Sequence, residues 1–230
     1  MELSKNRILC VGDSLGLPRD DVKFEDTWYY KLVESFPDFF VIPQFVRGIN
    51  TDALVSPTRG DYLELYTPNI VILQIGIVDC APRFLKRDSI FVRAINVFPK
   101  SLSSKIWILI SKYGRRKAIH ADVSPAKFEA NLRNYFDRCA TLKVGGVFVI
   151  KIAQPSQNMI IKNPRITEQV KIYNSVFERL KNEYEFISLI DPLQSGENNL
   201  FLKDGYHLNA EGNKNVFEYI YSNIVYISNV

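Results

Sequence analysis

Three polar side chains near opposite ends of the chain could together form a nucleophilic site. Ser14 follows the apolar run "ILCV" (8–11), and His207 lies three residues after Asp204 in "KDGYHLNAEG" (203–212). A serine hydroxyl attacks efficiently only when a base takes its proton, and that base is usually a histidine oriented by a carboxylate. The spacing lets Asp204 reach Nδ1–H of His207, which directs Nε2 outward. We therefore expect Ser14 as the nucleophile, His207 as the base and Asp204 as the acid that orients it.

Each of these residues also has a purely structural interpretation. Gly12-Asp13-Ser14 could be a plain turn, because Gly, Asp and Ser favour turns for backbone reasons alone. Asp204 could be an acid at a helix N-terminus, and His207 could be a buried, hydrogen-bonded histidine. The other histidine, His120, lies among positive charges that disfavour its imidazolium, so His207 is the better candidate base.

The elements that must position these residues alternate between strand and helix patterns. Short apolar, β-branched runs predict strands covered on both faces at 8–11, 39–46, 70–75, 147–152 and 186–190. Helix patterns lie between or after them, from Ser124-Pro125, from Thr167 and from near Asn209. This alternation predicts a three-layer α/β/α sandwich around a parallel sheet of about five strands, with right-handed crossovers.

Polar loops follow three of the predicted strands, at Gly12-Asp13-Ser14, at "RGIN" (47–50) and at "GIVD" (76–79). Functional sites in such sheets gather at the carboxyl ends of the strands. We therefore expect the three loops to converge on one rim.

Composition narrows the class of protein. With 230 residues, 47% of them hydrophobic, the chain can bury one core, and we expect a single domain over 1–230. The sequence contains no uncharged apolar segment of 18 residues, so it predicts no membrane span. The apolar run before Gly12 is too short for the hydrophobic core of a signal peptide, and we therefore expect a cytoplasmic protein. Cys10, Cys80 and Cys139 form no CxxC pair and fit a reducing compartment. No metal-ligand cluster is visible, and we expect no cofactor.

Residues 83–120 interrupt the alternation. They contain ten Lys and Arg residues against one acid, with apolar residues interleaved. We expect a helical basic insertion laid over the rim with its basic side outward. It could be a solvated face, or it could bind an anionic partner such as a glycan, a nucleotide-linked sugar or the acidic cytoplasmic leaflet. Nucleic acid is less favoured because no recognition motif accompanies Trp107 and Tyr113.

The blocks "GDSL" (12–15) and "DGYH" (204–207) resemble the first and last blocks of the SGNH/GDSL hydrolase family. The resemblance implies a flavodoxin-like sheet and a triad of Ser14, His207 and Asp204. It also implies an oxyanion hole made by the Ser14 amide, a glycine amide after the second strand and an asparagine side chain. Gly48 in "RGIN" matches the glycine block. The stretch "GIVDCAPR" (76–83) is similar to that of family members associated with bacterial surface-polysaccharide genes.

The third block departs from the family pattern Gly-x-Asn-Asp, because Val78 stands where the asparagine donor belongs. Loss of one such donor costs about 10²- to 10³-fold in rate. Another group could substitute for it, and we therefore take as candidates for oxyanion or substrate binding Asp13, Gly48, Asn50, Gly76, Asp79 and Arg83. Gly48 could instead be present only because the turn requires a residue with positive φ. Asp79 could cap its loop or pair with Arg83.

These observations favour a serine esterase that removes an acetyl or short acyl group from a carbohydrate. Three alternatives stay open. The same triad could transfer the acyl group to a sugar hydroxyl, the protein could be a catalytically weak glycan-binding protein, or it could be a lipid or thioester acylhydrolase with 88–110 as a lid. The sequence does not set the oligomeric state.

Overall fold

A central parallel sheet organises the molecule in the computed structural model, which describes residues 6–19, 21–86, 89–194 and 197–228. The strand order is β2-β1-β3-β4-β5, and every neighbouring pair is parallel. Each strand lies within two residues of its predicted position, which confirms the α/β prediction. The strands are β1 (Asn6–Gly12), β2 (Phe39–Phe45), β3 (Ile70–Gln74), β4 (Gly146–Ile150) and β5 (Ile187–Ile190).

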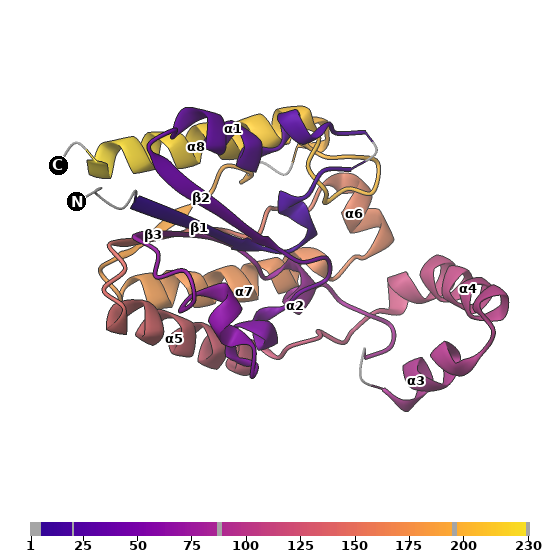
Figure 1. Ribbon diagram of the computed structural model, residues 1–230. Helices are drawn as coiled ribbons and strands as arrows, with labels where there is room; N and C mark the ends of the chain where they lie inside the picture. Colours follow the sequence, from indigo (N-terminus) through magenta and orange to yellow (C-terminus); the bar gives the residue numbers. More distant parts are fainter. Residues whose placement is uncertain (1–5, 20, 87–88, 195–196, 229–230) are drawn as a thin grey trace.

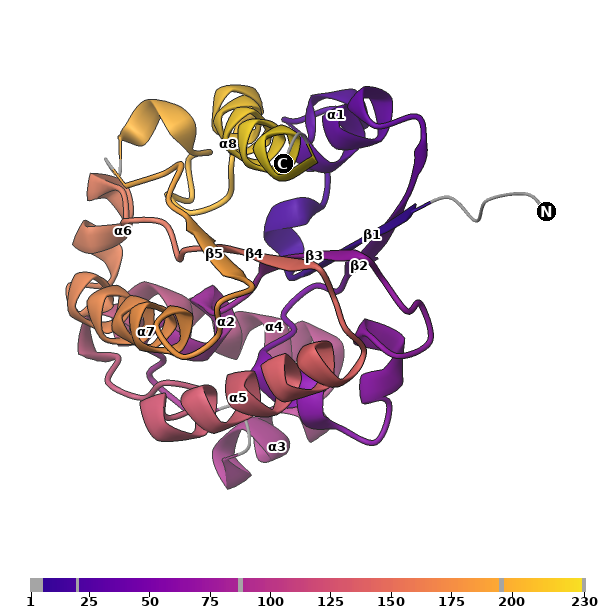
Figure 2. The same ribbon diagram turned by 90° about the vertical axis from the view of Figure 1, so that its left-hand side faces the viewer.

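Helices cover both faces of the sheet (Figures 1 and 2). On one face α1 (Trp28–Ser35) and α8 (Ala210–Ser228) pack on one apolar core, and on the other α5 (Pro125–Thr141) and α7 (Ile166–Lys181) pack on a second. Burial of these apolar side chains from water is the main force that holds the layers together. The three-layer sandwich is therefore as expected.

Local signals set the helix starts. The hydroxyl of Ser124 accepts a hydrogen bond from the Lys127 amide at the start of α5, and the side chain of Asn209 accepts one from the Gly212 amide at the start of α8. Such caps satisfy amides that the first turn leaves without helical partners.

Shorter elements connect these layers. The α2 (Ile77–Cys80) and α6 (Gln157–Lys162) helices lie near the carboxyl ends of the strands (Figure 1). Tight 3₁₀ turns occur at Ser14–Gly16, Phe24–Asp26, Thr51–Val55, Arg59–Tyr62, Arg115–Lys117 and Asn198–Leu200, and a π turn at Ile110–Gly114.

The basic insertion leaves the sheet at a narrow neck, where the Arg83 amide donates to the His120 carbonyl and the His120 amide donates to that of Arg83. Its helices α3 (Ile90–Val97) and α4 (Lys100–Leu109) pack on each other and project away from the sheet (Figure 1). The prediction that they lie over the rim is wrong. Most of their large apolar side chains are exposed, so the rest of the molecule covers little of the apolar surface of these two helices. No described helix is long and apolar enough to cross a membrane.

Candidate active site

The loop after β1 places Ser14 at the carboxyl edge of the sheet. The carboxylate of Asp13 accepts the Leu15 amide at 2.8 Å and caps the turn that Ser14 begins. Glycines allow this close approach: a Cβ on Gly12 would lie 2.8 Å from the Gln74 carbonyl oxygen, and one on Gly16 would lie 2.5 Å from the Phe45 ring. Ser14 therefore begins the expected turn, and its side chain is half-buried there.

A second tight loop, between β5 and α8, carries Asp204 and His207. Oδ1 of Asp204 accepts the amides of Tyr206 and His207 at 3.1 and 3.0 Å, and Oδ2 lies 2.6 Å from Nδ1 of His207. Gly205 between them has φ +92°, a conformation that side chains with a Cβ disfavour. The predicted reach of Asp204 to Nδ1 is present.

The two loops meet at His207. Its Nε2 lies 3.0 Å from Oγ of Ser14, across 193 residues of sequence, and the imidazole is almost fully buried. One guanidinium nitrogen of Arg19, Nη2, also contacts this Nε2. A neutral imidazole with its proton on Nδ1 presents Nε2 as an acceptor to both neighbours.

Electrostatics favour the neutral imidazole. Burial is the largest cause that lowers the pKa of His207; Asp204 opposes this shift, and the positive charges of Arg19 and Arg47 add to it. For Asp204, desolvation alone would raise the pKa, but the hydrogen bonds from His207 and from the two backbone amides outweigh it and the pKa is lowered. Asp204 is thus an anion and His207 a neutral base near neutral pH.

A cleft with a volume of about 420 Å³ opens over these groups. Of the residues predicted for the site, Ser14, Gly48, Arg83, Asp204 and His207 line it, and Gly48 has φ +72°. Its other lining residues are Arg19, Arg47, Ile77, Val78, Ala81, Pro82, Met159, Asn163 and Tyr206.

The structure does not bring the remaining candidates into this cleft. Asn50 caps the 3₁₀ turn at Thr51 by accepting the Asp52 amide, and Gly76 begins α2 at φ +123°, where a Cβ would meet Ile152 at 2.8 Å. Asp13 is buried in its cap. These residues hold loops in place.

Asp79 is a buried anchor for the loop that carries Gly48. Its Oδ1 accepts both the amide and the hydroxyl of Thr51, at 2.9 and 2.5 Å, and Thr51 in turn accepts from the Asn131 amide group of α5. Burial raises the pKa of Asp79 to about 6, although the Thr51 donors oppose the shift. Arg83 pairs with Asp122 at 2.6 Å, so the suggested Asp79–Arg83 pair does not form.

The buried carboxyl of Asp13 makes folding stability depend on pH. Burial raises its pKa to about 7, whereas an unfolded chain has an ordinary carboxyl pKa of about 4. The folded protein therefore binds more protons between these values, and its free energy of unfolding should fall as pH rises through that window. Urea unfolding at about pH 5 and about pH 8 measures this fall. Asp13→Asn should make it shallower, and Asp61→Asn at an exposed position should not; an equal slope in all three proteins would contradict the expectation.

Sequence reasoning missed Arg19 and Arg47. Arg47 directly precedes Gly48, and Arg19 follows Ser14 by five residues. Their proximity in sequence to these two candidate residues was the only signal that could have found them. Nη2 of Arg47 donates to the Pro18 carbonyl at 3.4 Å, which links the two loops that carry these arginines.

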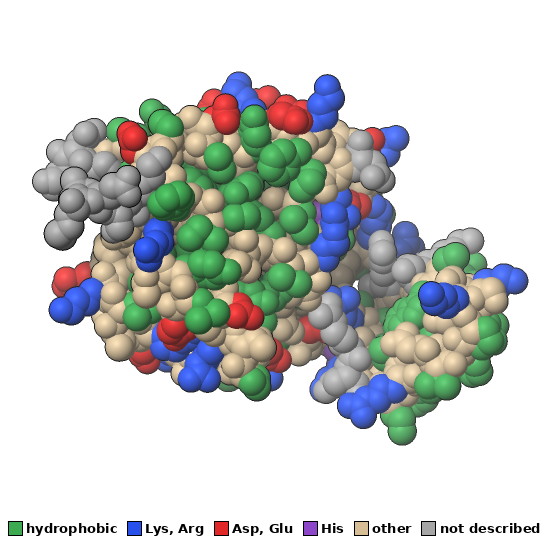
Figure 3. Space-filling model, in the orientation of Figure 1, with side chains coloured by type: hydrophobic (Ala, Val, Ile, Leu, Met, Phe, Trp, Pro, Cys, Tyr) green, Lys and Arg blue, Asp and Glu red, His purple; other side chains and the backbone are tan. Residues whose placement is uncertain are grey.

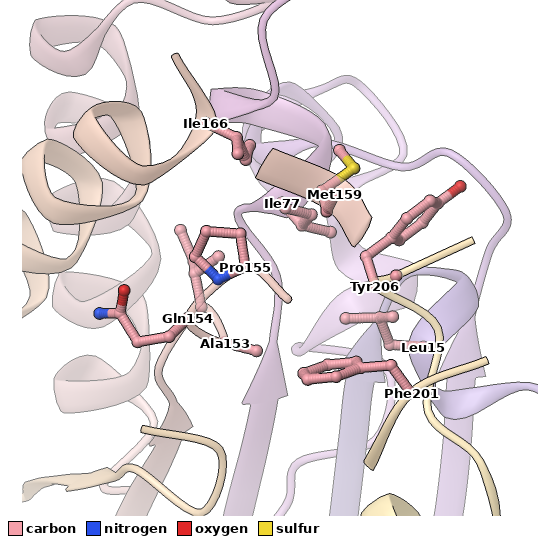
Figure 4. Close-up of a pocket in the computed structure, with 11 residues that line it drawn as sticks. Leu15, Ile77, Ala153, Gln154, Pro155, Met159, Ile166, Phe201 and Tyr206 are labelled. Carbon is pink, nitrogen blue, oxygen red and sulfur yellow. The ribbon is translucent and has the colours of Figure 1, made fainter. Parts of the chain in front are cut away.

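A small apolar pocket adjoins the cleft and shares Ile77, Met159 and Tyr206 with it (Figure 4). Its volume of about 20 Å³ is far below the 420 Å³ of the cleft. Leu15, the residue after Ser14, also lines this pocket, whereas Ser14 itself lines the larger cleft.

The described residues contain no group of three or more His, Cys, Asp or Glu side chains that could hold a metal ion. All three cysteines are buried and free of disulfides. Burial raises the pKa of each thiol, so none is an activated nucleophile.

Solved structures with the same fold are esterases and lipases. The psychrotrophic esterase EstA from Pseudoalteromonas sp. is 18% identical, with a TM-score of 0.63 over 98% of this chain and 100% of that chain. The acetyl xylan esterase AlAXEase is 16% identical, with a TM-score of 0.64 over 95% and 99%. A lipolytic protein of the G-D-S-L family from Desulfitobacterium hafniense is 12% identical, with a TM-score of 0.62 over 94% and 97%.

The fold is thus that of the SGNH/GDSL hydrolases, as the sequence resemblance implies. No protein-family model and no curated protein matches the sequence. The likeness therefore lies in the three-dimensional structure and in the short blocks around Ser14 and His207.

Proposed function

We propose that this protein is a serine ester hydrolase with Ser14, His207 and Asp204 as its triad. The observation that carries the proposal is the unbroken chain of contacts from Oγ of Ser14 through both ring nitrogens of His207 to Oδ2 of Asp204. A hydroxyl, a neutral buried imidazole and a carboxylate in this order make up the machinery for acyl transfer to serine.

The reaction has two halves. Oγ of Ser14 attacks the ester carbonyl carbon while Nε2 of His207 takes the hydroxyl proton, and the carbonyl electron pair moves onto its oxygen. Collapse of this intermediate expels the alcohol, which takes the proton from His207 and leaves an acyl group on Ser14. Water then attacks in the same way and releases the acid. The amides of Ser14 and Gly48 are the donors we assign to the oxyanion, on the family resemblance.

An acetyl or another short acyl group is our proposal for the acyl part of the ester, and the small apolar pocket that Leu15, Ile77 and Met159 line next to the cleft supports it. The larger, more polar cleft would hold the alcohol, and a carbohydrate is our proposal for it. Two neighbours in fold, an acetyl xylan esterase and an acetyl-xylooligosaccharide esterase from Geobacillus, support this choice. Transfer of the acyl group to a sugar hydroxyl uses the same first half-reaction and differs only in the second acceptor.

Labelling with a fluorophosphonate and turnover of p-nitrophenyl acetate test the proposal. We expect intact-mass labelling of the wild type and loss of both label and turnover in Ser14→Ala, while Ser104→Ala, at an exposed hydroxyl, retains both. Appearance of acetylated sugar when xylose oligomers are added would identify the transferase alternative. A folded wild type that takes no label and hydrolyses no ester would refute the proposal and favour a binding protein.

The pH profile supplies a second check. The base acts as neutral imidazole, and the pKa of His207 lies below the ordinary 6.5. The kcat/KM for p-nitrophenyl acetate should therefore rise with pH through an inflection below 6.5 and stay level across neutral pH. An inflection well above 6.5 would contradict the assignment of His207 in this environment.

We also keep a reducing, cytoplasmic compartment as a proposal, supported by three buried free thiols. Fractionation of the producing cells tests it. Enrichment in an oxidising, extracytoplasmic fraction would overturn it.

A further inference from the structure

Positive charge gathers at one side of the cleft. Arg19, Arg47 and Arg83 line it together, and the one carboxylate among the lining residues, Asp204, is held by His207. Arg83 is neutralised by Asp122 at 2.6 Å. Within the described ranges neither Arg19 nor Arg47 has an ion pair with an acid, although the charge of Arg19 acts on the buried Asp13 carboxyl. Both guanidinium-bearing residues line the cleft together with Ser14.

The position of Arg19 is unusual for a resting side chain. Its Nη2 contacts a neutral imidazole nitrogen, and its buried Nε has no hydrogen-bond partner among the described residues. A guanidinium bonds more strongly to a carboxylate or phosphate than to a neutral acceptor, because both oxygens of the anion can be bound at once. Arg19 and Ser14 both contact Nε2 of His207. If an anion bound Arg19 instead, Nε2 would be hydrogen-bonded to the Ser14 hydroxyl alone.

We propose that the cleft selects esters that carry an oxyanion group, a carboxylate or a phosphate, which Arg19 and Arg47 hold beside Ser14. This inference rests on the proposed esterase function and narrows its substrate class. Binding of the anion draws Arg19 away from Nε2 of His207, and the neutral imidazole is then paired with the Ser14 hydroxyl alone. Arg47 is linked to the Arg19 loop through the Pro18 carbonyl, and both residues line the same cleft.

Matched acetate esters test the charge requirement. We would compare 4-acetoxybenzoate with its neutral methyl ester, and add 4-acetoxyphenyl phosphate to distinguish carboxylate from phosphate. Mono-4-nitrophenyl succinate against 4-nitrophenyl acetate asks whether the charge can lie on the acyl side. We expect kcat/KM for at least one anionic ester to exceed that of its neutral counterpart by about tenfold or more.

Variants assign the effect to the two arginines. Arg19→Gln and Arg47→Gln should each reduce the preference for the anionic ester, whereas Arg59→Gln, which removes an exposed arginine outside the cleft, should leave it unchanged. The charged groups that act on His207 are Asp204, Arg19 and Arg47. Loss of Arg19 should therefore also raise the pKa of His207 and move the acid limb of kcat/KM to higher pH.

The outcomes separate this inference from the proposed function. Turnover of neutral and anionic esters at equal kcat/KM overturns the anion subsite and leaves the esterase intact. Absence of turnover for every ester overturns the esterase. In that case calorimetric titration of Ser14→Ala with 4-acetoxybenzoate still reports on the subsite, and absence of binding overturns it.

A second, independent observation concerns the projecting segment of α3 and α4, residues 89–109. Large apolar side chains are exposed over it, among them Ile90 (76%), Val97 (86%) and Ile108 (64%). Residues 89–119 contain no acid in sequence, and Arg93, Lys100 and Lys105 are exposed between the apolar side chains. Figure 3 shows both kinds of side chain together on this part of the molecule.

We infer that this segment docks on an anionic lipid bilayer. Exposed apolar side chains interspersed with lysine and arginine are typical of helices that lie in a membrane interface, with apolar groups among the acyl chains and cations at the headgroups. A second copy of the chain would bring like charges together. Nucleic acid offers no partner for the aliphatic side chains.

Sedimentation with vesicles tests this second inference. The full chain should sediment with phosphatidylcholine vesicles that contain phosphatidylglycerol and should be released by high salt. Lys105→Glu should weaken binding about fivefold or more. Phe91→Ser should weaken it, and Phe40→Ser, at an exposed position on β2, should not. Equal binding to pure phosphatidylcholine, no binding at all, or a concentration-dependent dimer that Phe91→Ser dissociates would each overturn the inference.

Discussion

Replacement of His207 by alanine is expected to lower kcat for p-nitrophenyl acetate by about 10⁴-fold or more. Without the imidazole, no described group within hydrogen-bond distance of the Ser14 hydroxyl can take its proton. Asp204→Asn should cost about as much, because an amide at this position favours the wrong tautomer of the ring. The two losses should not add in the double variant, since the residues act as one unit.

A matched control is available in the second histidine. His120 contributes its backbone to the neck of the insertion, where its amide and carbonyl pair with Arg83. His120→Ala should therefore retain wild-type turnover. Acyl transfer through serine loses far more than tenfold in rate when its base is removed. A His207→Ala variant that kept more than about a tenth of the wild-type kcat would therefore show that the proposed triad is wrong.

Substitution of Val78 by asparagine is expected to raise kcat by about 10- to 100-fold. Val78 lines the cleft and carries no donor, whereas an amide at this position can donate to the oxyanion of the tetrahedral intermediate. One such donor is worth about 10² to 10³ in rate where it is built in, and an introduced donor should recover part of this. KM should change little, because the bond strengthens only as charge develops.

Val78→Asp is the matched control, because an aspartate side chain has nearly the same shape as asparagine but cannot donate a hydrogen bond when it is ionised. Rate measurements under single-turnover conditions on all three proteins would isolate acylation. An unchanged rate in Val78→Asn would show that a group already present in the cleft fills the place of the missing donor, and Arg19, Arg47 and Arg83 are the cations that line it.

Much of the fold could be predicted from sequence because each strand is an apolar run, and because α5 and α8 begin at the capping residues Ser124 and Asn209. Ser14 and Gly48 follow β1 and β2 in sequence, which predicts that both lie at the same edge of the sheet. The spacing of Asp204 and His207 predicts the contact between their side chains. These features are local, or they follow from the rule that parallel strands end together.

What escaped prediction depends on contacts between distant segments. The role of Asp79 as an anchor requires Thr51 and Asn131, which approach it only in the folded chain. Arg19 and Arg47 lie in loops whose paths no periodicity describes. The insertion was expected over the rim because its apolar residues suggested a covered face, yet α3 and α4 pack mainly on each other and leave much of that surface outward.

The separation of Ser14 from His207 by 193 residues has a consequence for the protein during its synthesis. At ribosomal rates of about 5 to 20 residues per second, the proposed nucleophile is made some 10 to 40 s before its proposed base. The sheet is complete in sequence at Ile190, before Asp204 is added. A nascent chain can thus build most of its scaffold before Asp204 and His207 exist, and the proposed hydrolytic site forms only as the segment that carries them folds onto the sheet.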